Sequence, residues 1–133
     1  DLVLSGDVEY TDWTQMEFAN ANPDVMAQNR DFKTIFRPTA NFRGGIEYDI
    51  RQLGVRLRGG YIYNKSPYEG DPSTYDQKYI TGGVGILLGG TTMLDLTYAR
   101  GSWDTFRYNY NSTSRTDEQI TTNTFIMTFS HRF

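Results

Sequence analysis

The sequence predicts an all-β protein whose strands run up and down in one antiparallel sheet, as in a transmembrane β-barrel. Three observations support this: six segments alternate apolar and polar residues, the connections alternate between long and short, and the last nine residues form the alternating stretch FIMTFSHRF. In that last stretch the large apolar residues share one parity and the polar residues the other. Alternate side chains of a strand face opposite sides, so one side suits lipid and the other a polar lumen.

The first half of the chain contains three of the expected strands. The first, about Leu2–Phe18, opens with the alternation LVLSGDVEYT. The second, about Pro38–Tyr48, reads TANFRGGIEY, and the third, about Gly54–Asn64, contains VRLRGGYIYN. Period-two alternation of this kind predicts strands that have one apolar face.

The second half supplies three more strands. The fourth, about Tyr79–Leu88, is rich in glycine, and the fifth begins near Thr92 with TMLDLTYA. The sixth covers about Gln119–Phe133 and ends in the alternating stretch described above. Helical periodicity is weak throughout, so no long helix is expected.

The connections indicate which end of each strand faces outward. Three are long and polar and two are short, and they alternate along the chain: Asn20–Arg37, Asp49–Leu53, Lys65–Lys78, Gly89–Thr91 and Ser102–Glu118. Outer-membrane barrels have short periplasmic turns and long outer loops. Both ends of this chain are therefore expected on the periplasmic side, and the paired glycines Gly89 and Gly90 fit a tight hairpin turn.

The turns also predict register. A turn centred near Arg51 and Gln52 would place Glu47 opposite Arg56, and a turn centred on Gly90 would place Asp95 opposite Gly85. Charged residues of the inward parity are the candidate lumen lining: Arg43, Glu47, Arg56, Arg58 and Asp95. They would either guide solute or form a structural ion network inside the barrel.

Tyrosines of the outward parity form a candidate aromatic girdle, since amphipathic rings favour the membrane–water boundary. These are Tyr10, Tyr61, Tyr63 and Tyr98 near the outer strand ends and Tyr48 near the periplasmic end. The alternative is the ordinary preference of aromatic residues for strands.

Composition excludes several classes of function. The chain of 133 residues suits one domain, has no cysteine and carries a net charge of −3, so thiolate metal sites and nucleic-acid binding are not expected. Mean hydropathy is −0.59, too polar for membrane-spanning helices. The single histidine, His131, adjoins Ser130, but neighbouring strand residues face opposite sides and cannot act as nucleophile and base.

No enzyme activity, cofactor or metal is therefore expected. Three weaker signals point to other sites. Glu69, Asp71 and Asp76 share one loop and could offer oxygen ligands to calcium, but acidic outer loops are usually only solvated. Residues 111–113, Asn-Ser-Thr, match an N-glycosylation sequon, but we interpret them as ordinary polar loop residues. The glycine run at residues 82–85 has no helix after it and so lacks a phosphate site.

Three stretches resemble the C-terminal part of the FadL/OmpP1/TodX family of outer-membrane transporters, and the sequence is similar in character to the Bacteroidetes members. They are GDVEYTDWTQM from Gly6, RGGIEYDIRQLGVRLRGGYIYNKSPY from Arg43, and DQKYITGGVGI followed by LDLTYARG. No single motif is highly specific, but their order and spacing span nearly the whole chain. The resemblance implies a fourteen-stranded barrel with an N-terminal hatch, of which this chain would supply about the last six strands.

The resemblance also implies a function, a location and partners. The expected function is passive diffusion of hydrophobic compounds, such as long-chain fatty acids, across the bacterial outer membrane. The lipid bilayer and the barrel assembly machinery are the expected partners. The machinery would read a C-terminal signal, here Phe125, Met127, Phe129 and Phe133.

Two alternatives stay open: a structural or docking barrel in a larger secretion or assembly complex, and a soluble sheet protein. Six strands are too few for an independent membrane barrel, which begins at about eight. The first segment could be split, or further strands could lie in Ser102–Glu118. A missing N-terminal part is the favoured expectation, and the edge of the last strand should then not close onto Leu2–Tyr10.

Overall fold

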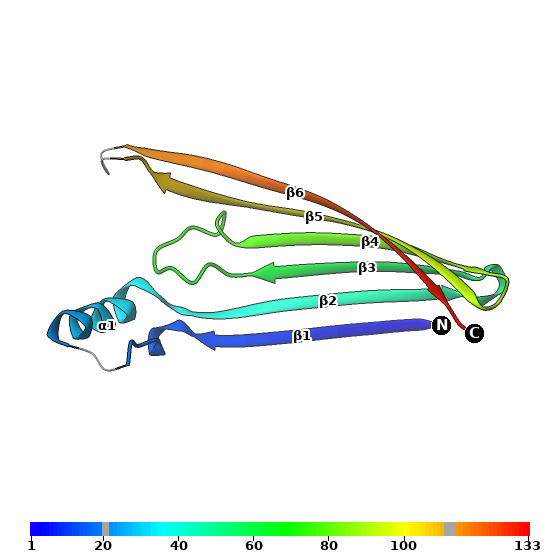
Figure 1. Ribbon diagram of the computed structural model, residues 1–133, viewed down its shortest axis with the longest axis horizontal. Coiled ribbons are helices and arrows are strands. Elements are labelled where there is room, and N and C mark those ends of the chain that lie inside the picture. The colour runs from blue at the N-terminus through cyan, green and yellow to red at the C-terminus, as the bar shows by residue number, and fades with distance from the viewer. Residues whose placement is uncertain (20–21, 111–113) are drawn as a thin grey trace.

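The computed structural model describes residues 1–19, 22–110 and 114–133, and they form one open antiparallel sheet of six strands in the order β1-β2-β3-β4-β5-β6 (Figure 1). The strands are β1 Leu2–Asp12, β2 Pro38–Ile50, β3 Val55–Asn64, β4 Gln77–Leu88, β5 Thr92–Tyr108 and β6 Arg115–His131. One α-helix, α1 Pro23–Ile35, and two 3-10 turns, η1 Trp13–Gln15 and η2 Arg51–Leu53, complete the fold. The prediction of an all-β, up-and-down antiparallel fold is confirmed.

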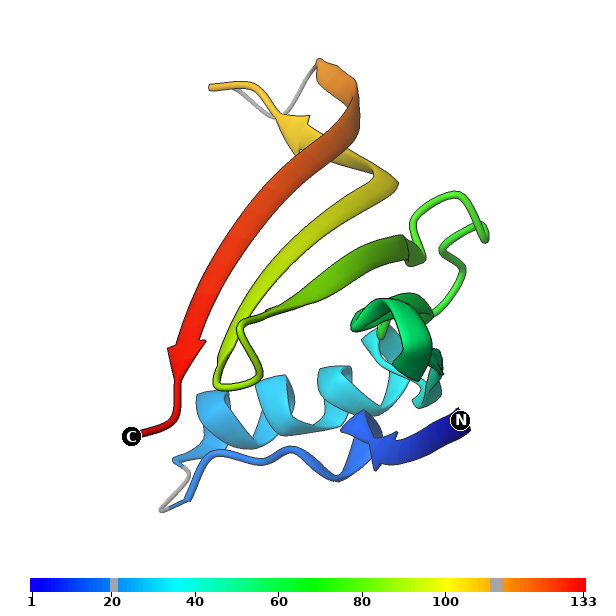
Figure 2. The ribbon, with the colours of Figure 1, turned by 90° about the vertical axis from the view of Figure 1, so that its right-hand side faces the viewer.

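The described part of the sheet has no hydrophobic core of its own. Among the described residues no apolar side chain is buried, and the buried polar ones are Thr39, Ser66 and Asp76. Seen from the turn end, the sheet curves into an open trough with the two termini on its two sides (Figure 2). The described parts of β1 and β6 each pair on one side only, so the sheet does not close.

The two short turns lie at one end of the strands, together with both termini (Figure 1). Gly89 and Gly90 have φ of 62° and 80°, which confirms the expected glycine hairpin turn. In the other turn, η2 is followed by Gly54 in the left-handed region, with φ of 61°. Glycine is favoured there because any Cβ would be strained.

The register between β4 and β5 is as predicted, with Asp95 opposite Gly85. The register between β2 and β3 is not. Glu47 lies opposite Arg58, and Arg56 lies opposite Asp49, because the turn is centred about one residue later than expected. The shift of two residues preserves the parity, so every side chain stays on its predicted face.

The long connection before β2 contains a helix that hydrophobic periodicity did not predict. Asn22 caps α1 by accepting a bond from the Val25 N–H, and proline occupies its first turn, both common at helix starts. Phe32 packs against Phe18 and Phe36, with ring centroids 5.4 and 5.9 Å apart. Within the described residues no helix is long and apolar enough to cross a membrane.

Two strand boundaries also differ from prediction. β1 ends at Asp12 rather than near Phe18, because the Asp12 carboxylate caps η1 by accepting bonds from Thr14 and Gln15. The hydrogen bond from the Thr14 hydroxyl, and next in size the bond from the Gln15 amide, hold the pKa of Asp12 below its usual value. The expected loop from Ser102 to Glu118 is instead mostly the paired ends of β5 and β6. Its charged residues concealed the alternation.

Candidate functional site

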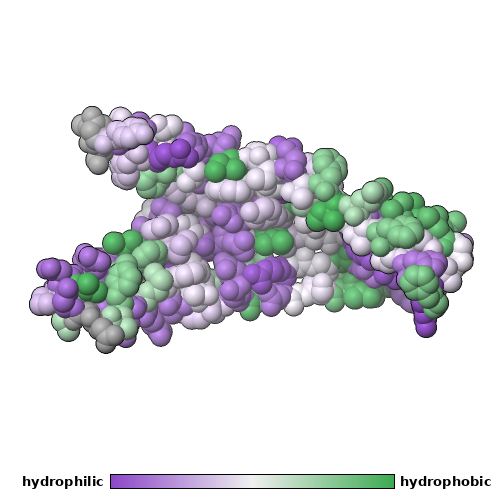
Figure 3. Space-filling view, viewed as in Figure 1, coloured by the Kyte–Doolittle hydropathy of each residue, from purple (hydrophilic) through white to green (hydrophobic). Residues whose placement is uncertain are grey.

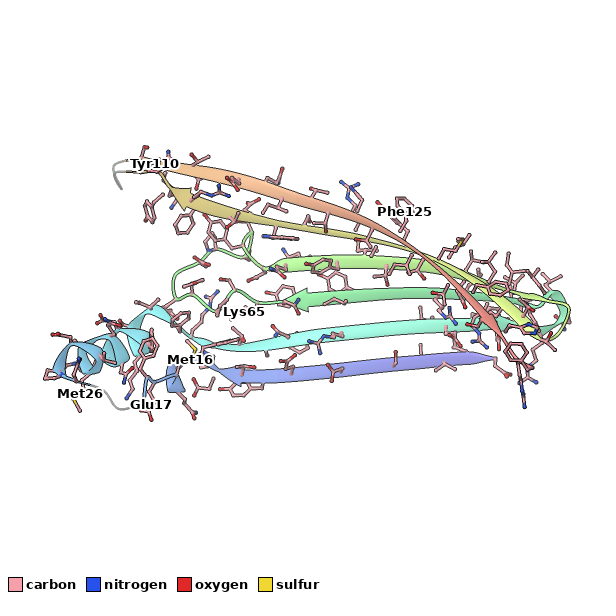
Figure 4. All side chains as sticks on the ribbon, viewed as in Figure 1. Met16, Glu17, Met26, Lys65, Tyr110 and Phe125 are labelled. Atoms are coloured by element: carbon pink, nitrogen blue, oxygen red, sulfur yellow. The ribbon has the colours of Figure 1, made fainter. Side chains whose placement is uncertain are left out.

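The outward face of the sheet carries large apolar side chains exposed to the surroundings. Exposed fractions reach 71% for Leu4, 69% for Tyr10, 73% for Met127 and 80% for Phe125. In Figure 4, Phe125 projects from β6 away from the other strands. A soluble sheet would bury such a face in a core. This apolar band is the first candidate functional surface.

The band is tilted relative to the hydrogen-bonded rows of the sheet. Leu2 and Met127 lie in one such row, which crosses all six strands through directly paired residues. On β1 the outward residues stay apolar from Leu2 to Tyr10, which lies eight residues beyond this row, and the next outward residue is the charged Asp12. On β6 it continues only from Met127 to Phe125, two residues beyond the row, before Asn123. The loop-side limit of the band therefore moves by six residues.

The intermediate strands show the same drift. Counted from the turn end, the outward apolar runs reach Tyr10, Pro38, Tyr63, Ile80, Tyr98 and Phe125 on β1 to β6 in turn. On β5 three polar outward positions follow Tyr98 before the aromatic residues Phe106 and Tyr108. Six residues along a strand make about 20 Å, and five strand spacings make about 24 Å. The band thus crosses the strands at about 40° from their hydrogen-bonding direction. Strands of outer-membrane barrels tilt by about 35–45° from the membrane normal, which would produce this drift.

The height of the band fits a bilayer. Nine residues of β1, Leu2–Tyr10, extend about 27 Å along the strand. A tilt of about 40° reduces this to a height of about 20 Å, close to the apolar band of about 25 Å on membrane barrels.

Four of the six loop-side limits are aromatic. Phe125 packs on Tyr98 with ring centroids 4.8 Å apart, and Tyr63 packs on Phe42 at 6.4 Å. The Tyr98 hydroxyl donates to Asn123 at 2.7 Å, and the Tyr63 hydroxyl bonds to Asp76, so both rings have one polar end.

The girdle positions need one correction. Tyr98 does not lie near the outer end of its strand, because β5 continues ten residues further to Tyr108; it lies instead at the limit of the apolar band. Tyr10 occupies the corresponding limit on β1. Tyr61 lies two residues inside the limit on β3, and Tyr48 lies near the turn end of β2.

Of the C-terminal residues singled out in the sequence, Phe125, Met127 and Phe129 face outward from β6, and Phe133 follows the end of that strand. Phe129 pairs with Leu94 and is 68% exposed, and the His131 ring contacts the Phe133 ring edge-to-face at 4.9 Å. His131 Nδ1 lies 2.8 Å from the Thr92 hydroxyl on the neighbouring strand.

The opposite, concave face carries a ladder of ion pairs. Arg58 contacts Glu47 at 2.7 Å and Asp95 at 2.5 Å. Arg56 contacts Asp49 at 3.2 Å and Glu47 at 3.3 Å. The space-filling view shows this face as largely hydrophilic over the middle of the strands, with apolar residues gathered at the turn end (Figure 3).

A second part of the ladder lies nearer the β1 edge. Arg43 contacts Asp7 and Glu9, each at 2.6 Å. All five predicted lumen residues thus share one face and make ion pairs. Sequence reasoning had not selected the partners Asp7, Glu9 and Asp49, although they have the inward parity and lie on neighbouring strands.

Small residues leave room beside the ladder. One hydrogen-bonded row on the concave face consists of Ser5, Gly45, Gly60, Thr81, Ala99 and Thr124. A hollow of about 530 Å³ lies along its β1 to β4 portion. Gly85 has a different role: a Cβ there would come within 2.6 Å of the Asp95 carboxylate, so the glycine gives Asp95 space to reach Arg58.

The loop from β3 to β4 is tied to the sheet by buried polar groups. Asp76, 3% exposed, accepts bonds from the Ser66 N–H and the Tyr63 hydroxyl. The Ser66 hydroxyl donates to Asp71 at 2.5 Å. Asp71 and Asp76 therefore have protein partners, and within the described ranges no group of three or more metal-binding side chains converges. The sequon at residues 111–113 lies outside the described residues.

Comparison with protein-family models, with curated proteins and with solved structures found no match for this chain. The features of the chain that bear on function are the apolar band, the ion-pair ladder and the hollow between the small residues.

Proposed function

We propose that this chain is part of the wall of an outer-membrane β-barrel of the FadL/OmpP1/TodX type, which transports hydrophobic compounds such as long-chain fatty acids by passive diffusion. The tilted apolar band carries the membrane part of this proposal. It combines an exposed apolar face, a bilayer-like height, aromatic residues at its limit and a drift that matches the strand tilt of membrane barrels.

Further strands are needed to complete such a wall. Backbone groups at an open sheet edge cost several kcal/mol each in hydrocarbon. Both β1 and β6 present such an edge, so in a membrane each must pair with strands beyond those described. The resemblance in GDVEYTDWTQM and the RLRGGYIYNKSPY stretch supports a fourteen-stranded barrel as the complete form.

The transport part of the proposal rests on the resemblance and on the concave face. The ion pairs of Arg56 and Arg58 neutralise the charges of this face locally, and the row of small residues leaves space next to them. Such a surface suits a water-exposed lumen wall without covalent chemistry. The substrate class comes from the resemblance alone.

A docking role in a larger secretion or assembly complex is the second candidate. The unpaired edges of β1 and β6 favour it, since an exposed strand edge is a template for pairing with another chain. Purification under mild detergent would separate the candidates, because a docking role requires stoichiometric co-purification with a complex.

Membrane integration is tested by extraction. The proposal requires that alkaline carbonate leaves the protein in the membrane pellet and that detergent releases it. Release by carbonate alone would refute the barrel.

Transport is tested by uptake of labelled oleate. Cells that lack the protein should take up oleate more slowly than cells in which it is restored, while uptake of a small hydrophilic solute should not change. Equal oleate uptake in an integrated barrel would refute transport and favour docking.

A further inference from the structure

A second hollow lies at the loop end of the concave face, where segments distant in sequence meet. It has a volume of about 900 Å³ and is bounded by η1, the end of α1, the loop from β3 to β4, and β5. Phe36 and Tyr68 form an isolated bridge beside it, and the Asp104 N–H donates to the Thr74 carbonyl at 2.8 Å. In Figure 4, Lys65 of this lining lies at the loop end of β3.

Aromatic rings line this cavity. The five are Trp13, Tyr68, Tyr75, Trp103 and Phe106. They include both tryptophans of the chain. Trp13 is held by a bond from its indole N–H to the Thr39 hydroxyl at 3.0 Å, and Tyr75 packs on Phe106 at 5.9 Å. Ring faces attract cations, tryptophan most strongly. The Arg115 guanidinium already lies 4.7 Å from the Phe106 ring centroid.

The charges of the lining favour a cation as well. Among the described lining residues, Glu69, Asp71 and Asp104 carry negative charge and Lys65 carries positive charge. The Arg37 guanidinium donates to the Ser66 and Asp71 carbonyls beside the cavity, and with Arg37 counted the net charge is −1. Asp71 is engaged by the Ser66 hydroxyl, so Glu69 and Asp104 are the carboxylates to which a ligand would turn.

One polar atom of the lining residues could accept a hydrogen bond from a ligand. Asn64 Oδ1 is buried and has no hydrogen-bond partner among the described residues. An unpartnered buried acceptor is costly, and a rotation of the Asn64 amide toward the cavity would let a ligand N–H satisfy it.

From these observations we infer that the cavity binds an organic ammonium ion, with its apolar part against the aromatic rings and its N–H groups toward Glu69, Asp104 and Asn64. This site goes beyond the proposed transport of hydrophobic compounds and does not rest on it, because strands and loops of the sheet itself bound the cavity. Its failure would leave the membrane proposal untouched.

The test uses intrinsic tryptophan fluorescence of the purified full protein at fixed ionic strength, since both tryptophans line the cavity. The probes are cyclohexylammonium and its neutral counterpart cyclohexanol. We expect a saturable fluorescence change with cyclohexylammonium and none with cyclohexanol at the same concentrations. Equal responses to the two probes, or no saturable response to the ammonium, would overturn the inference.

Variants locate the site. The double variant Glu69→Gln, Asp104→Asn should weaken cyclohexylammonium binding by roughly tenfold, because two attractive charges are lost. Glu17→Gln removes an exposed carboxylate outside the cavity and should leave binding unchanged. Circular dichroism checks that each variant is folded. A folded double variant that binds as tightly as the unaltered protein would also overturn the inference.

Discussion

The tilt of the apolar band makes a depth prediction that spin labels can measure. Gly6 and Asn123 lie in one hydrogen-bonded row of the sheet. Gly6 is at the centre of the band on β1, whereas Asn123 lies just beyond its limit on β6. Across about 24 Å of sheet, a tilt of about 40° separates the two positions by about 15 Å in depth. An untilted band would place them at equal depth.

The assay is accessibility of a nitroxide label to oxygen and to a water-soluble nickel chelate in lipid vesicles. The chain contains no cysteine, so Gly6→Cys and Asn123→Cys each give a single label. A Cβ at Gly6 meets only the Arg43 carbonyl, at an ordinary 3.8 Å. We expect the label at position 6 to favour oxygen strongly and the label at position 123 to favour the nickel chelate.

Phe129→Cys is the matched control for this measurement. It lies six residues from Asn123 along β6, at the centre of the band on that strand. Its depth should therefore equal that of Gly6, although the two are in different rows. Equal depths at positions 6 and 123, or nickel accessibility at all three positions, would refute the tilted-band reasoning.

Three further outcomes are expected. Leu96→Arg puts a charge inside the band and should lower the free energy of unfolding in vesicles by about 3 kcal/mol. Thr121→Arg lies beyond the band and should change this free energy by less than about 0.5 kcal/mol. Similar losses for both variants would contradict a lipid-facing band. Asp95→Ala should cost about 1–2 kcal/mol in urea unfolding, because the half-buried Arg58 loses one of its two partners, and no loss would mean that the pair is only a surface contact. Asn22→Ala should lower the local stability of α1 by about 1 kcal/mol, which would be measured as faster amide exchange within α1 and unchanged exchange in the sheet. Unchanged exchange in α1 would show that the cap contributes nothing.

Much of the sheet could be predicted from the sequence because the alternation of side chains is strict where one face is apolar. Parity alone assigned Glu47, Arg58 and Asp95 to one face, and the glycine pair at Gly89 fixed the register between β4 and β5. The register between β2 and β3 failed because η2 adds a 3-10 turn that composition does not distinguish from a simple hairpin loop.

The helix and the outer parts of β5 and β6 were missed for different reasons. α1 is stabilised by its Asn22 cap and by the packing of Phe32 on the distant Phe18, which a local window does not detect. Beyond Tyr98 the next three outward positions of β5 are polar, so the alternation is interrupted before Phe106 although pairing continues to Tyr108. The cavity between η1 and β5 depends on the tertiary arrangement of segments that are distant in sequence.

The continuation of β5 and β6 past the band favours the proposed membrane wall over half of a soluble sandwich. In a sandwich, a second sheet covers the apolar face in a direction close to that of the strands. Here the apolar run stops at Tyr98 on β5 and at Phe125 on β6, although about ten further residues of each strand remain paired. The outward positions that follow are polar on β6, and on β5 they are polar at Arg100, Ser102 and Asp104 before Phe106 and Tyr108. On β1 the same face stays apolar up to Tyr10, near the strand end. A boundary that crosses paired strands obliquely, with aromatic residues along it, is expected where a planar bilayer cuts a tilted sheet.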